Sequence, residues 1–230
     1  MNPTDLLLRD QRVLIVGGGS RMGLATARRA SNAGAHVILS SRSASRLEEA
    51  SGTLKGEVSV HVADASVPEQ AVAMFKALAP LDHIVVTASS GNVPAGGIPD
   101  TTPEIAQSAF ARFWISYHVL HFAPESVKPS GSITLLSGSS GRRPGIGFGV
   151  WSALHGSIES LARAAAIELA PVRINVVSPG GIGIRSDRQL VHHAGQPDDV
   201  AAMILAVITN PAVTNTVIDV DGGERLGNWP

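Results

Sequence analysis

The stretch Val13–Gly23 reads VLIVGGGSRMG, and it decides the fold of this chain. Its first four residues are apolar and predict a short buried strand, and a helix is expected to begin near Met22. Three glycines, a serine and an arginine lie between them. A glycine turn between a strand and a helix N-terminus gathers backbone N–H groups at the positive end of the helix dipole, where anions bind. Gly17–Gly23 therefore predicts a nucleotide site; the alternative is an ordinary tight turn.

Composition and charge exclude several classes of protein. The chain has 230 residues, 44% of them hydrophobic and 16% charged, with a formal net charge of −1. This balance predicts one well-buried globular domain over 1–230 and gives no electrostatic case for nucleic acid or an anionic membrane. The absence of cysteine excludes disulfides and thiolate chemistry. No signal peptide and no run of membrane-spanning length is seen, so a cytoplasmic protein is expected.

Strand-like and helix-like runs alternate along most of the chain. Repeated units of this kind, with nearly continuous apolar strands, predict a parallel sheet covered by helices on both faces. Ligands of such sheets bind beyond the carboxyl ends of the strands, so the loops that follow the strands should share one cleft. The expected strands are Val13–Val16, His36–Ser40, Val58–Ala63, His83–Ala88, Ser132–Ser137, Arg173–Val177 and Thr216–Val220.

The loops after the second and third strands indicate which dinucleotide would bind. An NAD site usually carries Asp or Glu after the second strand, to hold the ribose 2′-hydroxyl. This chain has Ser40, Ser41 and Arg42 there, and a guanidinium suits the 2′-phosphate of NADP(H). Arg21 adds a second cation, so NADP(H) is preferred over NAD(H). Asp64, after the third strand, is placed to accept from the adenine amino group; the alternative is a helix N-cap.

Six motifs spread over the chain together resemble the short-chain dehydrogenase/reductase family. They are the glycine turn Gly17–Gly23, the Asp64 turn, LDHIVVTAS at Leu81–Ser89, GSITLLSGSSG at Gly131–Gly141, RINVVSPGG at Arg173–Gly181 and IDVDGG at Ile218–Gly223. The resemblance runs essentially end to end and implies an α/β, doubly wound Rossmann fold with a mostly parallel, seven-stranded sheet. It also implies which residues hold the dinucleotide. These are Gly17, Gly19, Ser20, Arg21, Met22 and Gly23 for the pyrophosphate and ribose, Ser41, Arg42, Ala63 and Asp64 for the adenosine end, and Ala88, Ser89, Pro179, Gly180 and Ile182 for the nicotinamide side.

The catalytic residues of that family are missing from their positions. Members use a tyrosine acid/base, a lysine that lowers its pKa, a serine thirteen residues upstream that polarises the substrate oxygen, and an asparagine on the preceding long helix. Here Trp151 stands at the tyrosine position, His155 at the lysine position and Gly138 at the serine position. Arg21 also replaces a glycine of the turn, and the only tyrosine is Tyr117. The usual set therefore cannot be assembled.

Three interpretations remain open. In the first, the protein is an NADP(H)-dependent oxidoreductase for a small carbonyl, alcohol or activated C=C substrate, with a non-standard acid/base set. The candidates are His155, which would protonate near neutral pH one turn beyond Trp151, Tyr117 facing the same cleft, and Ser139 or Ser137. In the second, it is an inactive pseudoenzyme that binds a nucleotide and a partner. In the third, the cleft runs a non-redox elimination or isomerisation.

The remaining expectations concern simpler roles for Trp151 and His155, metal binding, the oligomeric state and the opening of the pocket. Trp151 could simply fill apolar volume, and His155 could contact the cofactor ribose. His192 and His193 lack further ligands at metal spacing, so no metal site is expected. The family pairs subunits through the helices at 103–127 and 151–169, so the resemblance implies a homodimer or homotetramer. Residues 181–197 are too few for the lid that the family often inserts, which predicts an open pocket or one covered by a neighbouring subunit.

Overall fold

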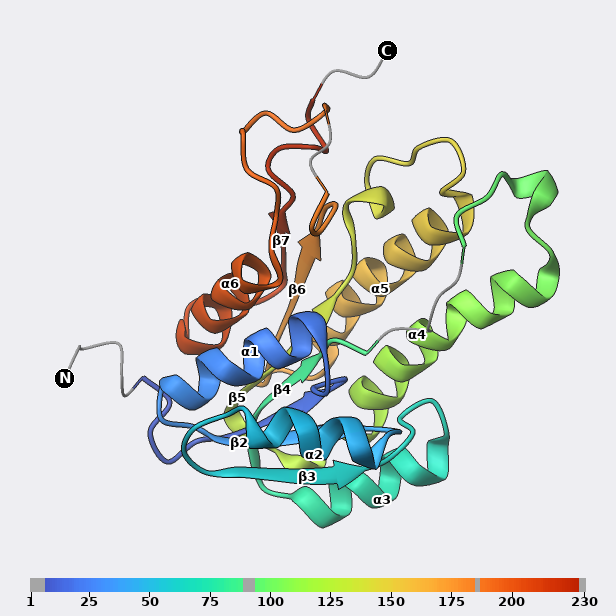
Figure 1. Ribbon diagram of the computed structural model, residues 1–230. Helices are drawn as coiled ribbons and strands as arrows, with labels where there is room; N and C mark the ends of the chain where they lie inside the picture. The colour runs from blue at the N-terminus through green and yellow to red at the C-terminus, as the bar shows by residue number, and fades with distance from the viewer. Residues whose placement is uncertain (1–6, 89–93, 185–186, 228–230) are drawn as a thin grey trace.

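A seven-stranded sheet forms the centre of the molecule (Figure 1). The computed structural model describes residues 7–88, 94–184 and 187–227. The strand order is β3-β2-β1-β4-β5-β6-β7, and every neighbouring pair is parallel. This confirms the expected doubly wound Rossmann fold. The strands are β1 (Arg12–Val16), β2 (His36–Ser41), β3 (Val58–Val62), β4 (Leu81–Val86), β5 (Val127–Leu136), β6 (Arg173–Pro179) and β7 (Thr216–Val220).

Six α-helices of the described chain cover the two faces of this sheet (Figure 1). Parallel neighbours need a crossover that passes over one face, and a helix is the usual crossover. One face carries α1 (Arg21–Asn32), α2 (Ala44–Gly52) and α6 (Pro197–Thr209). The other carries α3 (Pro68–Leu78), α4 (Pro103–Phe122) and α5 (Gly149–Glu168). The winding reverses between β1 and β4, the point at which ligands of such sheets bind.

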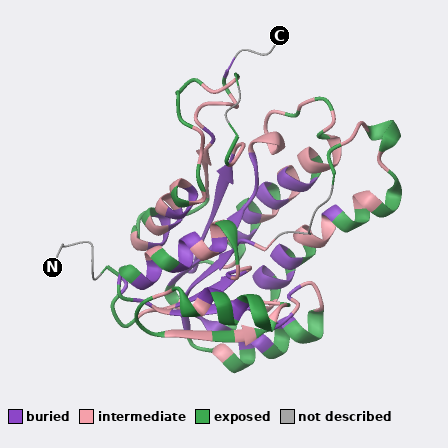
Figure 2. Ribbon diagram, in the orientation of Figure 1, coloured by how far each residue is buried: buried purple, intermediate pink, exposed green. Residues whose placement is uncertain are grey.

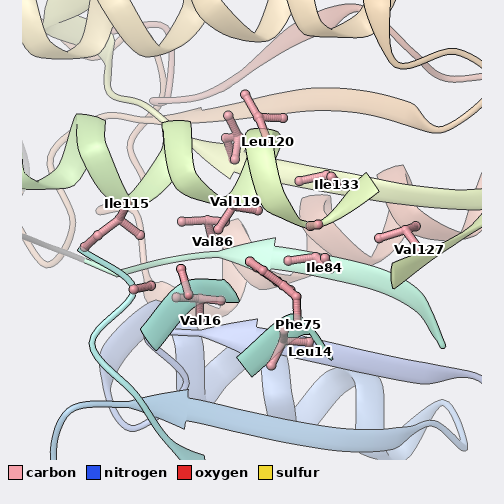
Figure 3. Close-up of a cluster of buried hydrophobic side chains, with 14 of the residues drawn as sticks. Leu14, Val16, Phe75, Ile84, Val86, Ile115, Val119, Leu120, Val127 and Ile133 are labelled. Carbon is pink, nitrogen blue, oxygen red and sulfur yellow. The ribbon is translucent and has the colours of Figure 1, made fainter. Parts of the chain in front are cut away.

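The core lies on both sides of the central strands. β4 and β6 are buried along their whole length, whereas β3 at the sheet edge is partly exposed (Figure 2). Figure 3 shows strand residues packed against Phe75 of α3 and against Ile115 and Val119 of α4. Burial on both faces is why these strands are continuous apolar runs rather than alternating ones.

Two segments bear on the site. The long helix α4 ends at Phe122 and not at about Val127 as expected, because Pro124 cannot continue a helix; a 3₁₀ turn, η3 (Pro124–Ser126), follows. Between Pro179 and Pro197 the described residues form turns and one bridge, Ile182–Gly195, and no helix. The short loop predicted there is therefore observed. Across the described ranges, no helix is long and apolar enough to cross a membrane.

Candidate functional site

A cavity of about 420 Å³ opens at the carboxyl ends of β1 to β4, beside α4. Backbone and side chains from four consecutive strand–loop junctions reach it, as the parallel topology requires. Ten of the predicted dinucleotide residues line it: Gly17, Gly19, Ser20, Arg21, Met22, Ser41, Arg42, Ala63, Asp64 and Ala88. The structure thus brings together most of the predicted pyrophosphate and adenosine groups in one place.

The glycine turn is shaped by close packing of the backbone. Gly17 has a φ of +92°, and a Cβ there would overlap the backbone of Thr87 and Ala88. A Cβ on Gly23 would overlap the carbonyl of Gly17 and the hydroxyl of Thr87. Gly23 is therefore buried between α1, β1 and β4 and does not line the cavity. Its role is to let the start of α1 approach the sheet, which leaves the helix N-terminus pointing at the cavity.

Arg21, which stands where the family's turn has a glycine, adopts a conformation that favours glycine. Its φ is +48°, in the left-handed region that residues other than Gly, Asn and Asp rarely adopt. Its side chain lines the cavity. Arg21 therefore carries some backbone strain and adds a cation to the wall of this cavity.

The adenosine end of the cavity is positively charged. Arg42 lies with Nη1 3.9 Å from Oδ2 of Asp64, and its own side chain is 69% exposed. Arg46, which was not among the predicted residues, also lines the cavity from the first turn of α2. The signal was available, because Ser43 is the N-cap of α2 and Arg46 follows Arg42 by four residues. Asp64 accepts from both the backbone N–H and the hydroxyl of Ser66 in the loop before α3. The N-cap of α3 is Val67, so the alternative of Asp64 as a helix N-cap is wrong.

A second cavity, of about 250 Å³, lies at the carboxyl ends of β5 and β6. Pro179 and Gly180, expected on the nicotinamide side, line it together with Ser139, Trp151 and His155. Ile182 lines neither cavity and instead pairs with Gly195 and packs against the core. Ser89 lies outside the described residues. Both cavities therefore lie at the carboxyl ends of the strands, the edge at which ligands of such sheets bind.

His155 is held by a series of hydrogen bonds, to Arg112 and Ser140, that was not predicted from the sequence. Its Nε2 lies 3.3 Å from Nη1 of Arg112, which comes from α4, and its Nδ1 lies 2.9 Å from the hydroxyl of Ser140. Arg112 also donates from Nη2 to the carbonyl oxygens of Leu136 and Ser137. Among the described residues no carboxylate pairs with Arg112. Ser140 lines the second cavity, so this series ends at its wall.

The protonation of His155 differs from the expectation. Burial, together with the nearby Arg112 guanidinium, lowers the pKa of His155 to about 3. Burial alone lowers the pKa of Arg112 to about 10, which leaves it charged at neutral pH. His155 is therefore a neutral imidazole at neutral pH, and the expectation that it protonates there is wrong for this arrangement.

The histidine and the missing serine are sterically linked. A Cβ on Gly138 would lie 2.5 Å from Cε1 of His155, and a Cβ on Gly141 would lie 2.8 Å from Cβ of His155. The imidazole thus occupies the space that a serine side chain at position 138 would need. Two of the departures from the family pattern, at 138 and 155, are one packing change.

Two other candidates lie away from this cavity. Tyr117 is 37% exposed, stacks on the ring of His121 and lines neither cavity. It lies five residues beyond Arg112, about 140° around the helix, so it faces away from the cleft. Ser137 is buried and donates to the buried carboxylate of Glu159. Trp151 does line the cavity; its ring centroid is 5.8 Å from that of His155, and it also packs against the core.

Comparison with known proteins agrees with the fold. A family model described as Enoyl-(Acyl carrier protein) reductase matches residues 18–224. The chain is 29% identical to the short-chain dehydrogenase/reductase ATR9 of Stachybotrys chlorohalonatus, over 95% of this chain and 98% of that one. It is 28% identical to human dehydrogenase/reductase SDR family member 4, over 94% and 88%.

Solved structures of short-chain dehydrogenases and reductases have the same fold as this chain. The MalC reductase/Diels–Alderase of Malbranchea aurantiaca superimposes with a TM-score of 0.86 at 27% identity, over 96% of this chain and 97% of that one. A small-chain dehydrogenase in complex with NADPH superimposes with a TM-score of 0.78 at 28% identity, over 94% and 99%. The chain belongs to the short-chain dehydrogenase/reductase family, whose members are oxidoreductases with a nicotinamide cofactor.

Proposed function

We propose that this protein is an NADP(H)-dependent oxidoreductase for a small carbonyl, alcohol or activated C=C substrate. The observation that carries the proposal is the pair of adjoining cavities at one sheet edge. The first is lined by three arginines, Arg21, Arg42 and Arg46, and by one carboxylate, Asp64. This excess of positive charge fits a pyrophosphate together with a 2′-phosphate. A similar solved structure holds NADPH, which supports the same choice.

The residues present fit a dinucleotide. The Gly17–Gly23 turn and the α1 N-terminus would hold the pyrophosphate, and Ser41 and Arg42 would hold the 2′-phosphate. Pro179 and Gly180, on the wall of the second cavity, would face the nicotinamide. When bound, the dinucleotide supplies the hydride chemistry. The chain's own residues orient the substrate, and Trp151 covers one side of the cavity with an apolar ring.

A turnover assay tests the proposal. NADPH consumption is followed over a panel of ketones, aldehydes and enones, with mass spectrometry of the products. We expect substrate-dependent oxidation of NADPH and a product that has gained two hydrogens. NADPH binding without turnover of any panel member would favour the inactive binding protein instead. A rearranged product without NADPH consumption would favour the non-redox alternative.

The choice of NADP(H) over NAD(H) has its own test. We expect Arg42→Ala to weaken NADPH binding about tenfold and to leave NADH binding within about twofold, since only NADPH carries the 2′-phosphate. Arg28→Ala removes an exposed arginine from α1 that does not line the cavity, and serves as the charge-matched control. Equal losses for both dinucleotides would overturn the assignment.

We also propose that the chain forms a homodimer or homotetramer through α4 and α5. Trp114 on α4 is 50% exposed and Ile167 on α5 is 74% exposed, and such side chains are usually covered in assemblies. Sedimentation velocity should show a dimer or tetramer, and Trp114→Glu should shift it toward monomer. A monomer at every concentration measured would contradict this.

A further inference from the structure

The hydrogen-bond chain from Arg112 through His155 to Ser140 has a fixed direction. An arginine guanidinium only donates, so Nε2 of His155 accepts from Arg112 across 3.3 Å. A neutral imidazole carries its single proton on the other nitrogen, here Nδ1. Nδ1 then donates to Oγ of Ser140 across 2.9 Å. Because Ser140 Oγ accepts this bond, its own hydroxyl proton remains free to donate elsewhere.

The hydroxyl proton of Ser140 can find a hydrogen-bond acceptor on the side of the second cavity. Ser140 lines the second cavity, and it is partly exposed while His155 is buried. Ser137 is 1% exposed and already donates to Glu159. Ser139 lines the cavity too, but the structure ties it to the η4 turn (Ser139–Gly141) through its backbone carbonyl, which accepts from Arg142 and Arg143. Of these three serines, only Ser140 both lines the second cavity and has its hydroxyl hydrogen-bonded to a described side chain behind it.

We propose that Ser140 donates the hydrogen bond that holds the acceptor oxygen of the substrate, and that Arg112 and His155 are positioning residues that set its direction. The ligand is a compound with a carbonyl oxygen at the cavity wall. This inference rests on the proposed function only in taking the second cavity as the substrate site. No proton is transferred in this role: the hydroxyl polarises the oxygen, and the neighbouring groups keep it aimed.

The first test measures the direction of the Arg112–His155–Ser140 hydrogen bonds without any ligand. Long-range ¹H–¹⁵N correlation spectra of uniformly labelled protein report the His155 tautomer, with the signal assigned by loss in His155→Gln. We expect the Nδ1–H form in the wild type and a mixture of both tautomers in Arg112→Met. Arg112→Lys, which keeps a donor, should retain the Nδ1–H form and guards against a folding defect of the methionine variant. An Nε2–H tautomer in the wild type would overturn the proposal.

The second test reads the bond to a ligand. The probe is 2-cyclohexen-1-one, with cyclohexene as the matched compound that lacks the oxygen, titrated by NMR with and without NADP⁺. We expect Ser140→Ala to weaken ketone binding about three- to tenfold, the cost of one lost hydrogen bond, and to leave cyclohexene binding unchanged. Ser140→Thr, which keeps a hydroxyl, should restore most of the ketone affinity. Ser157→Ala, on the same helix as His155 and off the cavity wall, should change neither.

Failures of the two proposals are distinguishable. Absence of NADP⁺ binding with an intact Ser140 effect would defeat the proposed function and leave this inference standing. An unchanged ketone affinity in Ser140→Ala, a loss in Ser139→Ala in its place, or a wild type that binds the ketone no better than cyclohexene would each overturn the assignment of Ser140.

Discussion

The two halves of the cleft differ in how far they depart from the family pattern. At the ends of β1 to β4 the glycine turn is present, and Arg21, at a family glycine position, adopts a left-handed conformation. At the ends of β5 and β6 the chemistry is rebuilt, with His155 filling the space beside Gly138 and Arg112 behind it. In this chain, packing of the main chain holds the glycine turn, whereas the changed side chains of the second half pack together as one group.

The largest expected effect tests the rigidity of the first half. Gly17→Ala places a Cβ on the backbone of Ala88 at a φ of +92°, so we expect a loss of about 2–5 kcal/mol in the free energy of unfolding. Gly19→Ala is the matched control, because its Cβ would meet only Arg46, at 3.6 Å, and we expect a change of about 0.5 kcal/mol or less. Urea unfolding of both variants measures this. Equal stabilities would show that the turn is not held by packing.

The next effect comes from pH and concerns two buried histidines, His155 in the second half of the cleft and His83 on β4. The pKa of His155 is lowered to about 3, and that of the buried His83 to about 4, both mainly by burial. The unfolded chain binds protons near pH 6.5 and the native chain does not, so stability is full above about pH 6.5 and falls as the pH drops toward these values. Between pH 7 and 5 we expect a loss of up to about 2 kcal/mol for each histidine.

Unfolding of His155→Gln and His83→Gln at both pH values separates the two contributions. Each variant should show a shallower loss of stability between pH 7 and 5 than the wild type. NMR titration of His155 should show no protonation above pH 5. A midpoint of 6–7 for His155 would contradict the buried, neutral imidazole and restore it as an acid/base candidate.

Restoring the family's serine sharpens the comparison. Gly138→Ser forces its Cβ against the imidazole of His155, and we expect a loss of about 1–3 kcal/mol in stability. In His155→Ala the same substitution should cost less than about 1 kcal/mol, so the pair should be coupled in a double-mutant cycle. Additive effects of the two changes would show that positions 138 and 155 vary independently.

The smallest effect concerns Arg21. Glycine relieves the left-handed strain, so Arg21→Gly should raise stability by about 0.5–1 kcal/mol and weaken NADPH binding a few-fold by loss of a cation. Thermal unfolding and NADPH titration measure the two consequences. A variant that is both less stable and equally tight in NADPH binding would show that Arg21 is a structural residue only.

The dinucleotide half was predictable from sequence because its determinants are local. A strand, a glycine turn and a helix adjoin at Gly17–Gly23, and Asp64 directly follows a strand. The substrate half was not, because its contacts join residues 43 apart (Arg112 and His155) and 15 apart (His155 and Ser140). One sequence signal pointed to Arg112: it is a cation between apolar residues of a predicted helix. Tyr117 was predicted to face the cleft because its helix borders the cleft. The prediction did not consider on which side of the helix Tyr117 lies.

If the first half of the cleft holds the dinucleotide, the changed side chains of the second half should leave that binding intact. Fluorescence titration of NADPH and NADH into the wild type, His155→Gln and Arg42→Ala tests it most directly. We expect the wild type to prefer NADPH, His155→Gln to retain this affinity within about threefold, and Arg42→Ala to lose the preference. No binding of either dinucleotide to the wild type would contradict it.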